Sequence, residues 1–422
     1  MKILVSAYEC APDRGSEAGI GWAWCSHLAL SGEQVWVITQ AANREAIERR
    51  LAERPVPNLH LTYVPTARMP EWVVRRVYGF WYPLYLHWQH RILKEAKRLD
   101  REVGFDAVHH VSWGSLQLGS RLWALGKPFF YGPVGGGQIA PEAFRSYFGD
   151  EWRIERFRAY IVQRLSGRAF GAGRAIANAH TVFVTNRDTE ALVRSLGGSR
   201  VQFLWDSAVP DGWLRTSGFD ATPEPGPLRL IWVGTLIRRK GILLALDVVT
   251  ALRGRRDVRL TIIGDGPDRP LLEETIAARG LGDIVTVRGR LPWEQVRDAY
   301  DEHPVMLFTS LRESLGMQLF EAMARGCAVV CLDLHGAASL VDDSCGIRVP
   351  VTDIAGTVRG LGDAVVALDD DRSRLASLRR GARRTAANLD WSTKVSLARR
   401  TYRTANGPAP GEIAVESCTA AE

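Results

Sequence analysis

Short apolar runs alternate with longer, mostly helical stretches along the 422-residue chain. In the first half, KILVSAY (2–8) and QVWVITQ (34–40) have the length and the β-branched content of buried strands. The stretch between them, GIGWAWCSHLALSG (19–32), is long enough for a helix. Strands that alternate with helices are typical of parallel α/β sheets, so the pattern predicts a doubly wound domain. Further strands are expected at 59–65, 105–111, 127–133 and 180–186.

The same alternation begins again after a Pro- and Gly-rich stretch at 217–227. Strands are expected there at 228–235, 258–266, 283–289, 305–310 and 327–333, with helices at 241–254 and 269–280. Because the chain is too long for one ordinary core, two domains are the natural interpretation. The expected division is a first domain at 1–205, a linker at 206–227 and a second domain at 228–385. A C-terminal helix at 386–406 is expected to pack back on the first domain. The tail at 407–422 has the composition of a disordered end.

Composition and charge narrow the class of protein only slightly. The hydrophobic fraction of 46% and the charged fraction of 24% are those of an ordinary globular chain. A net charge of +7 favours anionic membrane surfaces or phosphorylated partners, whereas no compact Lys/Arg tract or motif indicates nucleic acid. No apolar run reaches ~18 residues, so no membrane-spanning helix is expected. The six cysteines form no paired framework, which favours a reducing cytoplasm.

One segment, 71–98, is dense in aromatic and basic residues. Such a helix can lie on a membrane surface, and this reading would make the protein peripheral at the inner face of the membrane. Packing against the sheet of the first domain explains the same aromatic residues, and both interpretations remain open.

Basic residues follow the first strand of the second half. That strand ends at Gly234, and Arg238, Arg239 and Lys240 come directly before an expected helix. Open α/β sheets bind ligands at the carboxyl ends of their strands. Guanidinium and ammonium groups beside a helix start can hold a phosphate, although a solvated helix start has the same composition.

A glutamate lies inside an otherwise apolar helical run, SLRESLGMQLFEAMARG (310–326). Glu321 stands between Phe320 and Ala322, and an unpaired buried carboxylate costs several kcal/mol. Glu321 therefore needs a polar partner. The local candidate is Arg325, and the alternative partner is a ligand.

A second glutamate precedes the start of the same helix. Glu313 comes just before Gly316, and the next residues, Met317 and Gln318, offer unpaired helix amides to an anion. At ~1.5 Å per residue, Glu321 lies about 7–8 Å further along the helix axis. A diphosphate at the amides would bring a ribose diol to Glu321 and leave Glu313 beside the group beyond the phosphates.

These residues carry a resemblance to a known family. The order G-x-L…R-K-G, then GDGP, then E-S-L-G-x-x-L-x-E-A-M-A-x-G resembles the retaining glycosyltransferases of family 4. The E-x7-E pair of Glu313 and Glu321 is the most specific mark of that family. YECAPDRGSEAGIGWAW and YGPVGGGQIAPE resemble a subgroup associated with exopolysaccharide and specialised-metabolite glycosylation. The resemblance covers roughly residues 1–400 and implies the GT-B fold, in which two Rossmann-like domains face each other across a cleft.

The resemblance implies a role for each matching residue. Lys240 and a neighbouring arginine would hold the donor diphosphate, Glu321 the ribose, and Glu313 the donor sugar. The donor-binding set is Gly15, Gly19, Gly234, Arg238, Arg239, Lys240, Arg290, Glu313, Gly316, Met317, Gln318 and Glu321. The residues expected in catalysis are Glu313, Lys240, Arg239 and His110. Those expected to contact the acceptor are Glu17, His109, His110 and Gly136.

The sequence departs from the family pattern in two places. Thr235 follows Gly234 where the family usually has arginine, so Arg238 or Arg239 would have to replace it. No histidine occurs in YGPVGGGQ, where the family often has one near the reacting carbon. His109 and His110 are the nearest candidates, with a structural role as the alternative. Glu17 either contacts the acceptor or caps the following helix.

The predicted function is retaining transfer of a hexose-type sugar from a nucleoside diphosphate sugar, with UDP favoured, to an acceptor hydroxyl. The acceptor would be a saccharide, a lipid-linked molecule or a small metabolite. No metal is expected, because Lys240, an arginine and the helix amides would neutralise the leaving diphosphate. No other cofactor and no nucleic acid are expected either. The alternatives are a sugar-nucleotide 2-epimerase of the same fold and a non-catalytic partner protein that binds nucleotide sugar.

Overall fold

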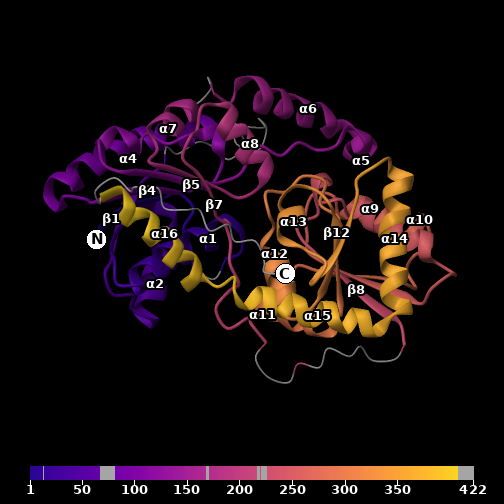
Figure 1. The fold of residues 1–422 in the computed structure, drawn as a ribbon. Coiled ribbons are helices and arrows are strands. Elements are labelled where there is room, and N and C mark those ends of the chain that lie inside the picture. Colours follow the sequence, from indigo (N-terminus) through magenta and orange to yellow (C-terminus); the bar gives the residue numbers. More distant parts are fainter. Residues whose placement is uncertain (13, 67–80, 168–170, 216–218, 220–225, 407–422) are drawn as a thin grey trace.

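The computed structural model describes residues 1–12, 14–66, 81–167, 171–215, 219 and 226–406. Within them, two parallel sheets lie side by side, and helices cover the faces of each (Figure 1). The strands of one sheet all come before residue 204, and those of the other all come after residue 227. This is the two-domain α/β architecture that the sequence predicts.

The first sheet has the strand order β3-β2-β1-β4-β5-β6-β7, and neighbouring strands are parallel. Its strands are β1 (Lys2–Ala7), β2 (Gln34–Gln40), β3 (Leu59–Val64), β4 (Ala107–Ser112), β5 (Phe129–Val134), β6 (Thr181–Val184) and β7 (Val201–Phe203). Its helices are α1 (Ser16–Leu30), α2 (Arg44–Glu53), α4 (Trp81–Val103), α7 (Ala172–Asn178) and α8 (Arg187–Ser195). The chain between β5 and β6 also forms α5 (Arg145–Phe148) and α6 (Trp152–Tyr160), whose residues Tyr147, Phe148 and Trp152 pack against the core of the second domain. Successive strands from β1 to β3 are added on one side of β1, and those from β4 onward are added on its other side. The loops after β1 and β4 are therefore neighbours.

The second sheet repeats this plan with the order β10-β9-β8-β11-β12-β13. Its strands are β8 (Leu228–Val233), β9 (Val258–Ile263), β10 (Val285–Gly289), β11 (Val305–Phe308), β12 (Ala328–Leu332) and β13 (Gly346–Val349). Its helices are α9 (Ile242–Leu252), α10 (Arg269–Ala278), α11 (Trp293–Glu302), α12 (Met317–Ala324), α13 (His335–Leu340), α14 (Ile354–Asp370) and α15 (Arg372–Ala387). Here the order reverses between β8 and β11, so the loops after these two strands meet.

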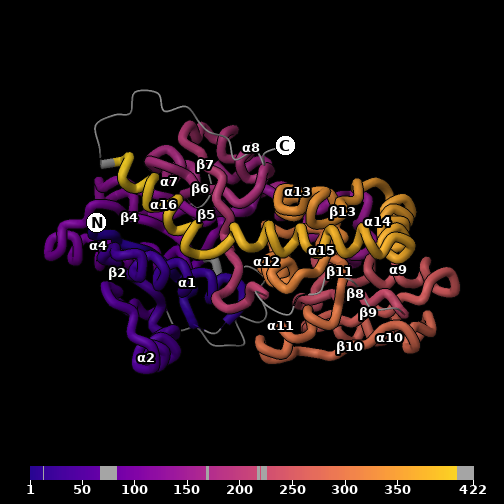
Figure 2. Tube along the Cα trace, turned by 60° about the horizontal axis from the view of Figure 1, so that its bottom comes forward, coloured from indigo at the N-terminus to yellow at the C-terminus, as the bar shows by residue number. Residues whose placement is uncertain are grey.

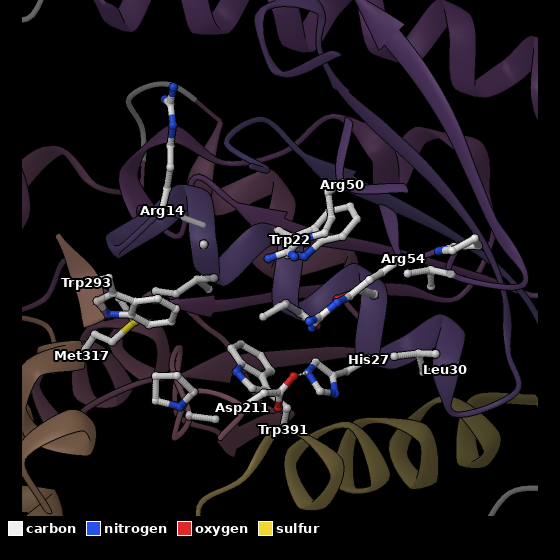
Figure 3. Close-up of a pocket in the computed structure, with 18 residues that line it drawn as sticks. Arg14, Trp22, His27, Leu30, Arg50, Arg54, Asp211, Trp293, Met317 and Trp391 are labelled. Atoms are coloured by element: carbon white, nitrogen blue, oxygen red, sulfur yellow. Dashed lines mark hydrogen bonds and ion pairs between the residues drawn. The ribbon is translucent and has the colours of Figure 1, made fainter. Parts of the chain in front are cut away.

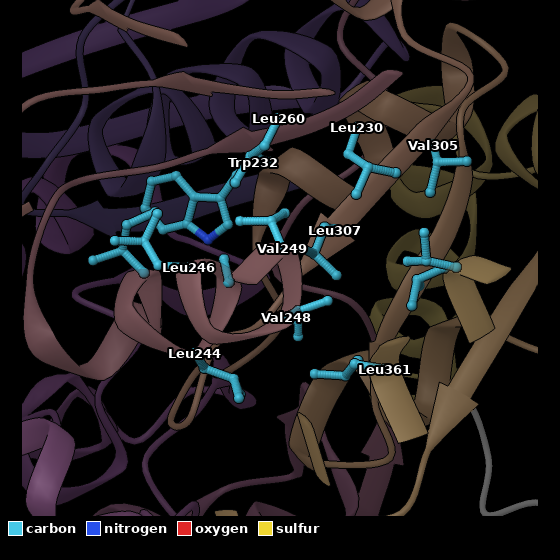
Figure 4. Packing of buried hydrophobic residues seen from close by; sticks show 14 of the residues in the cluster. Leu230, Trp232, Leu244, Leu246, Val248, Val249, Leu260, Val305, Leu307 and Leu361 are labelled. Carbon is cyan, nitrogen blue, oxygen red and sulfur yellow. The ribbon is translucent and has the colours of Figure 1, made fainter. Parts of the chain in front are cut away.

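Apolar side chains from strands and helices lock the second sheet to its covering layer. Leu230, Leu260 and Leu307 project from adjacent strands against Leu246 and Val249 of α9 (Figure 4). All five side chains are buried. Because parallel strands are covered on both faces, near-continuous apolar runs such as LRLIWV form them.

The C-terminal helix α16 (Trp391–Asn406) leaves the second domain and lies along the first (Figure 2). Trp391 makes an edge contact with Trp24 of α1, with ring centroids 6.3 Å apart. Tyr402 is fully buried against Phe130 of β5. The return of the C-terminal helix to the first domain is therefore confirmed. The helix expected at 386–406 corresponds to α16, which begins at Trp391, after α15 has ended at Ala387.

The aromatic segment at 71–98 lies partly outside the described residues, which resume at α4. Tyr85 and Trp88 of α4 are fully buried in the core of the first domain. Packing thus accounts for these two rings, whereas residues 71–80 belong to the part of the chain that is not described. Among the described residues, no helix has both the length and the apolar character needed to cross a membrane.

Candidate active site

The loops at the two strand-order reversals face each other across the space between the domains. A cavity of about 400 Å³ there has walls from both domains and from α16 (Figure 3). Gly19 belongs to its first-domain wall, Trp293 and Met317 belong to its second-domain wall, and Trp391 comes from α16. The open α/β sheets therefore place both ligand-binding edges on one cleft.

On the second-domain side, outside the lining of this cavity, lies a glutamate held by two cations. Glu313 follows β11, while Arg239 and Lys240 follow β8. Arg239 Nη1 donates to Glu313 Oε2 at 3.0 Å, and Lys240 Nζ forms an ion pair with the same oxygen. Burial alone would raise the pKa of Glu313, but Lys240 and then Arg239 outweigh it and lower the pKa to about 2. Glu313 is therefore a fixed anion beside two cations.

A helix N-terminus opens next to this cluster. Gly316 has a φ of +102° and precedes α12, and no side chain caps the helix start. A Cβ on Gly15, at the start of α1, would lie 3.4 Å from Met317 Cε, so the two helix starts approach each other across the cleft. Uncapped amides and the helix dipole make such an end a site for an anion.

The buried glutamate of α12 has neutral partners. Glu321 is 5% exposed, and its carboxylate accepts hydrogen bonds from Trp293 Nε1 at 3.1 Å and Tyr300 Oη at 3.3 Å. Arg325, the local candidate for its partner, instead binds Asp301 and donates to the Trp213 carbonyl. Burial raises the pKa of Glu321, because neither neutral donor supplies a compensating charge.

The two candidate replacements for the missing arginine differ in their contacts. Arg239 lies on Glu313, whereas Arg238 Nε pairs with Asp268 at 3.0 Å and reaches the Tyr147 carbonyl of the first domain. Of the two, Arg239 is thus the arginine that the fold brings to the cluster. Thr235 is exposed.

The remaining second-domain candidates lie at neighbouring strand ends. A Cβ on Gly264 would be 1.8 Å from the Gly234 carbonyl oxygen, so the ends of β8 and β9 touch through their glycines. Gly234 lies near Gln318, whose Nε2 would be 3.7 Å from a Cβ at that position. Arg290 is exposed directly after β10.

On the first-domain side, the glycine-rich loop after β5 contacts the residue that follows Glu313. A Cβ on Gly135 would lie 2.1 Å from Ser314 Oγ, which itself hydrogen-bonds Thr185 Oγ1 at 2.7 Å. Only glycine permits this approach. Gly136 is buried, and its carbonyl accepts from Gln117 Nε2 at 2.7 Å. The structure thus gives Gly136 a packing role and does not place it on an open acceptor surface.

The two histidines of β4 are interior residues. His109 is fully buried, donates to the Gly132 carbonyl and accepts from Tyr402 Oη at 2.7 Å. Its contact with α16 contradicts the expected contact with an acceptor. His110 is also fully buried, on the opposite face of the sheet, with Nε2 3.2 Å from the Trp113 carbonyl. Burial lowers both pKa values, to about 3 and about 4, so both rings are neutral at pH 7.

Glu17 is the first-domain carboxylate that the fold does bring to the cleft. It lies in the first turn of α1, so residues 16–19 are helical and not part of a loop. Its Oε2 accepts from the Gly114 amide at 3.4 Å, which joins the ends of β1 and β4. Burial, the carboxylate of Asp206 and that of Glu9 raise the pKa of Glu17 to about 7. Glu17 does not cap α1, whose start has no side-chain cap.

One further pair of residues, Asp206 and Lys394, was not predicted. Asp206 follows β7 and interacts electrostatically with Glu17, Glu313 and Lys394. Lys394 of α16 is 6% exposed, donates to the Ser207 carbonyl at 3.0 Å and lies 4.3 Å from the centre of the Trp391 ring. No motif marks either residue, because tertiary folding alone brings the linker and the last helix together.

Side chains that could bind a metal ion were considered as well. Within the residues that the structure describes, no group of three or more His, Cys, Asp and Glu side chains is arranged to hold a metal ion. Metal independence stays a prediction.

Two Rossmann-like domains across a cleft, with a returning C-terminal helix, define the GT-B fold of glycosyltransferases. A glycosyltransferase from Rickettsia africae has this fold, with a TM-score of 0.66 and 13% identity over 96% of this chain and 98% of its own. Anabaena HepE, solved with UDP and glucose, has a TM-score of 0.61 and 15% identity over 96% of this chain and all of its own.

Sequence comparison agrees with the fold. Residues 227–368 match the family described as Glycosyl transferases group 1. An alpha-D-kanosaminyltransferase of Streptomyces kanamyceticus is 34% identical over 35% of this chain and 38% of its own length. A 2-deoxystreptamine N-acetyl-D-glucosaminyltransferase of Streptomyces fradiae is 29% identical over 53% and 55%, respectively. The chain thus spans only about two fifths to just over half of the length of these two relatives.

A third relative is covered almost completely. A D-inositol 3-phosphate glycosyltransferase of Pseudarthrobacter chlorophenolicus is 25% identical over 90% of this chain and 88% of its own. Together, these comparisons show that the chain is similar to glycosyltransferases in both sequence and fold.

Proposed function

We propose that the protein transfers a hexose-type sugar from a nucleoside diphosphate sugar, with UDP favoured, to an acceptor hydroxyl, with retention of configuration and without a metal. The observation that carries the proposal is the cluster of Glu313, Lys240 and Arg239 beside the uncapped start of α12. A fixed carboxylate next to two cations and free amides fits a ligand that has sugar hydroxyls on one side and a diphosphate on the other.

In this proposal the diphosphate lies at the α12 amides and shares Lys240 and Arg239 with Glu313. As the bond to the sugar breaks, negative charge grows on the leaving phosphate, and these groups stabilise it. The departing phosphate oxygen takes the acceptor proton on the same face of the sugar. Neutral, buried His109 and His110 are not needed as bases in this scheme.

The ribose is assigned to Glu321. Its carboxylate already accepts two neutral donors, and a diol adds hydrogen bonds without adding a positive charge. Trp293, which holds Glu321, also forms part of the cavity wall next to Met317 (Figure 3). The shared tryptophan supports a link between this glutamate and a ligand in the cleft.

The acceptor is assigned to the first-domain side, opposite Glu313. Glu17 and Asp206 place carboxylates there, and such oxygens accept hydrogen bonds from hydroxyl or ammonium groups. The names of the 2-deoxystreptamine relative of Streptomyces fradiae and of the inositol phosphate relative point to small polyhydroxylated or amino-substituted acceptors. We therefore place aminocyclitols and inositol phosphates first in an acceptor panel, before lipid-linked and polymeric saccharides.

The experiment that tests the donor assignment is calorimetric titration with UDP, GDP, ADP and TDP. Glu321→Gln should weaken binding of the preferred nucleotide by about 1–3 kcal/mol, as expected for a charged hydrogen-bond partner. The control is Glu274→Gln, which changes an exposed glutamate of α10 and should leave the affinity unaltered. Absence of binding by any nucleotide, or an unchanged affinity in Glu321→Gln, would contradict the proposal.

A further inference from the structure

Exposed large hydrophobic side chains concentrate on one short helix. Among the described residues they are Leu30 of α1 and Ile154, Phe157 and Tyr160 of α6. The three on α6 are 39%, 64% and 54% exposed. With a spacing of three residues they share one face of the helix. A single exposed apolar residue is ordinary, whereas three on one face indicate a contact surface.

The opposite face of α6 is fixed to the protein. Glu155 is 6% exposed and forms ion pairs with Arg312 at 2.7 Å and Arg158 at 3.5 Å. Trp152 packs against the core of the second domain. The exposed rings therefore belong to a firmly anchored helix, and Figure 1 places that helix at the rim of the molecule.

The surroundings of the exposed face are basic. Arg153 and Arg156 of α6 and Arg164 in the following turn are exposed, whereas Glu155 points inward. The exposed carboxylates of this region, Asp150 and Glu151, precede the helix. An open hollow of about 740 Å³ continues the basic face beyond the helix, and its lining residues are Tyr160, Gln163, Arg164, Leu165, Gly167 and Leu196.

We propose that this face of α6 lies on an anionic lipid bilayer. Aromatic rings beside arginines suit the boundary between head groups and acyl chains, where the rings enter and the guanidinium groups meet lipid phosphates. A stable protein dimer needs about 800 Å² from each partner, which is more than three side chains on one nine-residue helix supply. A bilayer needs no such area and matches the positive charge.

This contact would bring the reaction cleft close to the membrane. Arg312, which binds the inner face of α6, directly precedes Glu313. A bilayer on the outer face then lies about one helix diameter, ~10 Å, from the loop that holds the candidate donor site. The inference goes beyond the proposed sugar transfer and does not depend on it.

Cosedimentation of the full chain with vesicles tests the proposal. The protein should sediment with vesicles that contain equal parts of phosphatidylglycerol and phosphatidylcholine, and hardly with phosphatidylcholine alone. The double variant Phe157→Ser/Tyr160→Ser should reduce the bound fraction at least about fivefold, because it removes the rings that enter the interface. Arg153→Ser/Arg156→Ser should reduce it through the charge, and Leu30→Ser, the matched exposed control, should not.

Three results would overturn the proposal. The first is that the wild type fails to sediment with the anionic vesicles. The second is equal loss of binding in Leu30→Ser and in the α6 double variant. The third is a dimer, seen by light scattering, that Phe157→Ser/Tyr160→Ser converts to a monomer while vesicle binding is absent. Thermal unfolding of each variant identifies any loss of binding that arises from misfolding.

Discussion

The two sides of the cleft each present a glutamate, in opposite electrostatic surroundings. On the second-domain side, Lys240 and Arg239 hold Glu313 and lower its pKa to about 2 against the burial that would raise it. On the first-domain side, burial and the carboxylates of Asp206 and Glu9 raise the pKa of Glu17 to about 7. Both residues follow strands at the point where the strand order of their sheet reverses. The two central strands of the repeated fold thus lead to glutamates in opposite surroundings, Glu17 after the first strand of its sheet and Glu313 after the fourth strand of the other.

This contrast separates an anion site from a hydroxyl site. The positive side suits a diphosphate, since its cations and helix amides remain able to bind a second anion. The other side repels an anion and accepts hydrogen bonds, which suits a polyhydroxylated or cationic acceptor. In the proposed function, this difference would keep the donor and the acceptor on opposite sides of the cleft.

The largest expected effect follows from neutralising the paired glutamate. Glu313→Gln should lower the rate of sugar transfer by at least about a hundredfold, a loss typical of a group that positions the reacting centre in an electrostatic site. Nucleotide binding should persist, because Lys240 and Arg239 lose a competitor for the diphosphate. Transfer assays with and without saturating acceptor measure the effect, and Glu274→Gln serves as the control. A variant that retains a third of the wild-type rate would show that the cluster does not act in the reaction.

The second-largest effect is expected on stability, from a substitution in α16. Lys394→Met removes the buried lysine that interacts electrostatically with Asp206 and should destabilise the fold by on the order of 3 kcal/mol, the size expected when one partner of a buried charge pair is lost. Adding Asp206→Asn should recover part of the loss, because no unpaired carboxylate remains. Urea unfolding of the two single variants and the double variant measures the coupling. Simple additivity of the single effects would mean that the two residues do not interact.

A smaller effect should depend on pH. The folded-state pKa of Glu17 is raised from 4.5 to about 7, so its contribution to stability is most favourable below pH 4.5 and declines as the pH rises to 7. Glu17→Gln removes this penalty and should raise Tm at pH 8, by about 2–4 °C for each kcal/mol regained, but not at pH 4.5. Calorimetry at the two values checks the sign. A gain at low pH, or a loss at pH 8, would contradict the assigned surroundings of Glu17.

The smallest effect should distinguish the two neighbouring arginines. Arg239→Met should weaken nucleotide binding clearly, whereas Arg238→Met should change it less than about twofold, since Arg238 is engaged with Asp268. Parallel titrations with the preferred nucleotide decide between them. A stronger effect for Arg238 would mean that this side chain leaves Asp268 for the phosphates.

The sequence was sufficient for most of the framework. QVWVITQ and CAVVCLD are short and rich in β-branched residues, as buried strands are. The structure confirms a strand in each, β2 and β12. The strands β7 and β13 were missed, because VQF and GIRV are too short to form a recognisable pattern. The start of the C-terminal helix was placed five residues too early, at 386, because the sequence does not mark the end of α15 at Ala387.

The site was predictable only where neighbouring residues carry it. Glu313, Gly316 and Glu321 lie within nine positions, so their spacing defines a helix start and a buried carboxylate. His109 belongs to a strand whose two faces are both buried, and the sequence does not show that its ring points toward α16. Asp206 and Lys394 meet through tertiary folding, for which the sequence offers no local signal.

The most direct test of the contrast between the two sides is a calorimetric titration of UDP into the wild type, Lys240→Met and Glu17→Gln. The account predicts that Lys240→Met weakens UDP binding at least about tenfold, the equivalent of 1.4 kcal/mol, whereas Glu17→Gln leaves it within about twofold. Circular dichroism of each variant confirms that it is folded. Equal losses in both variants, or an unchanged affinity in Lys240→Met, would contradict the assignment of the donor diphosphate to the second-domain side.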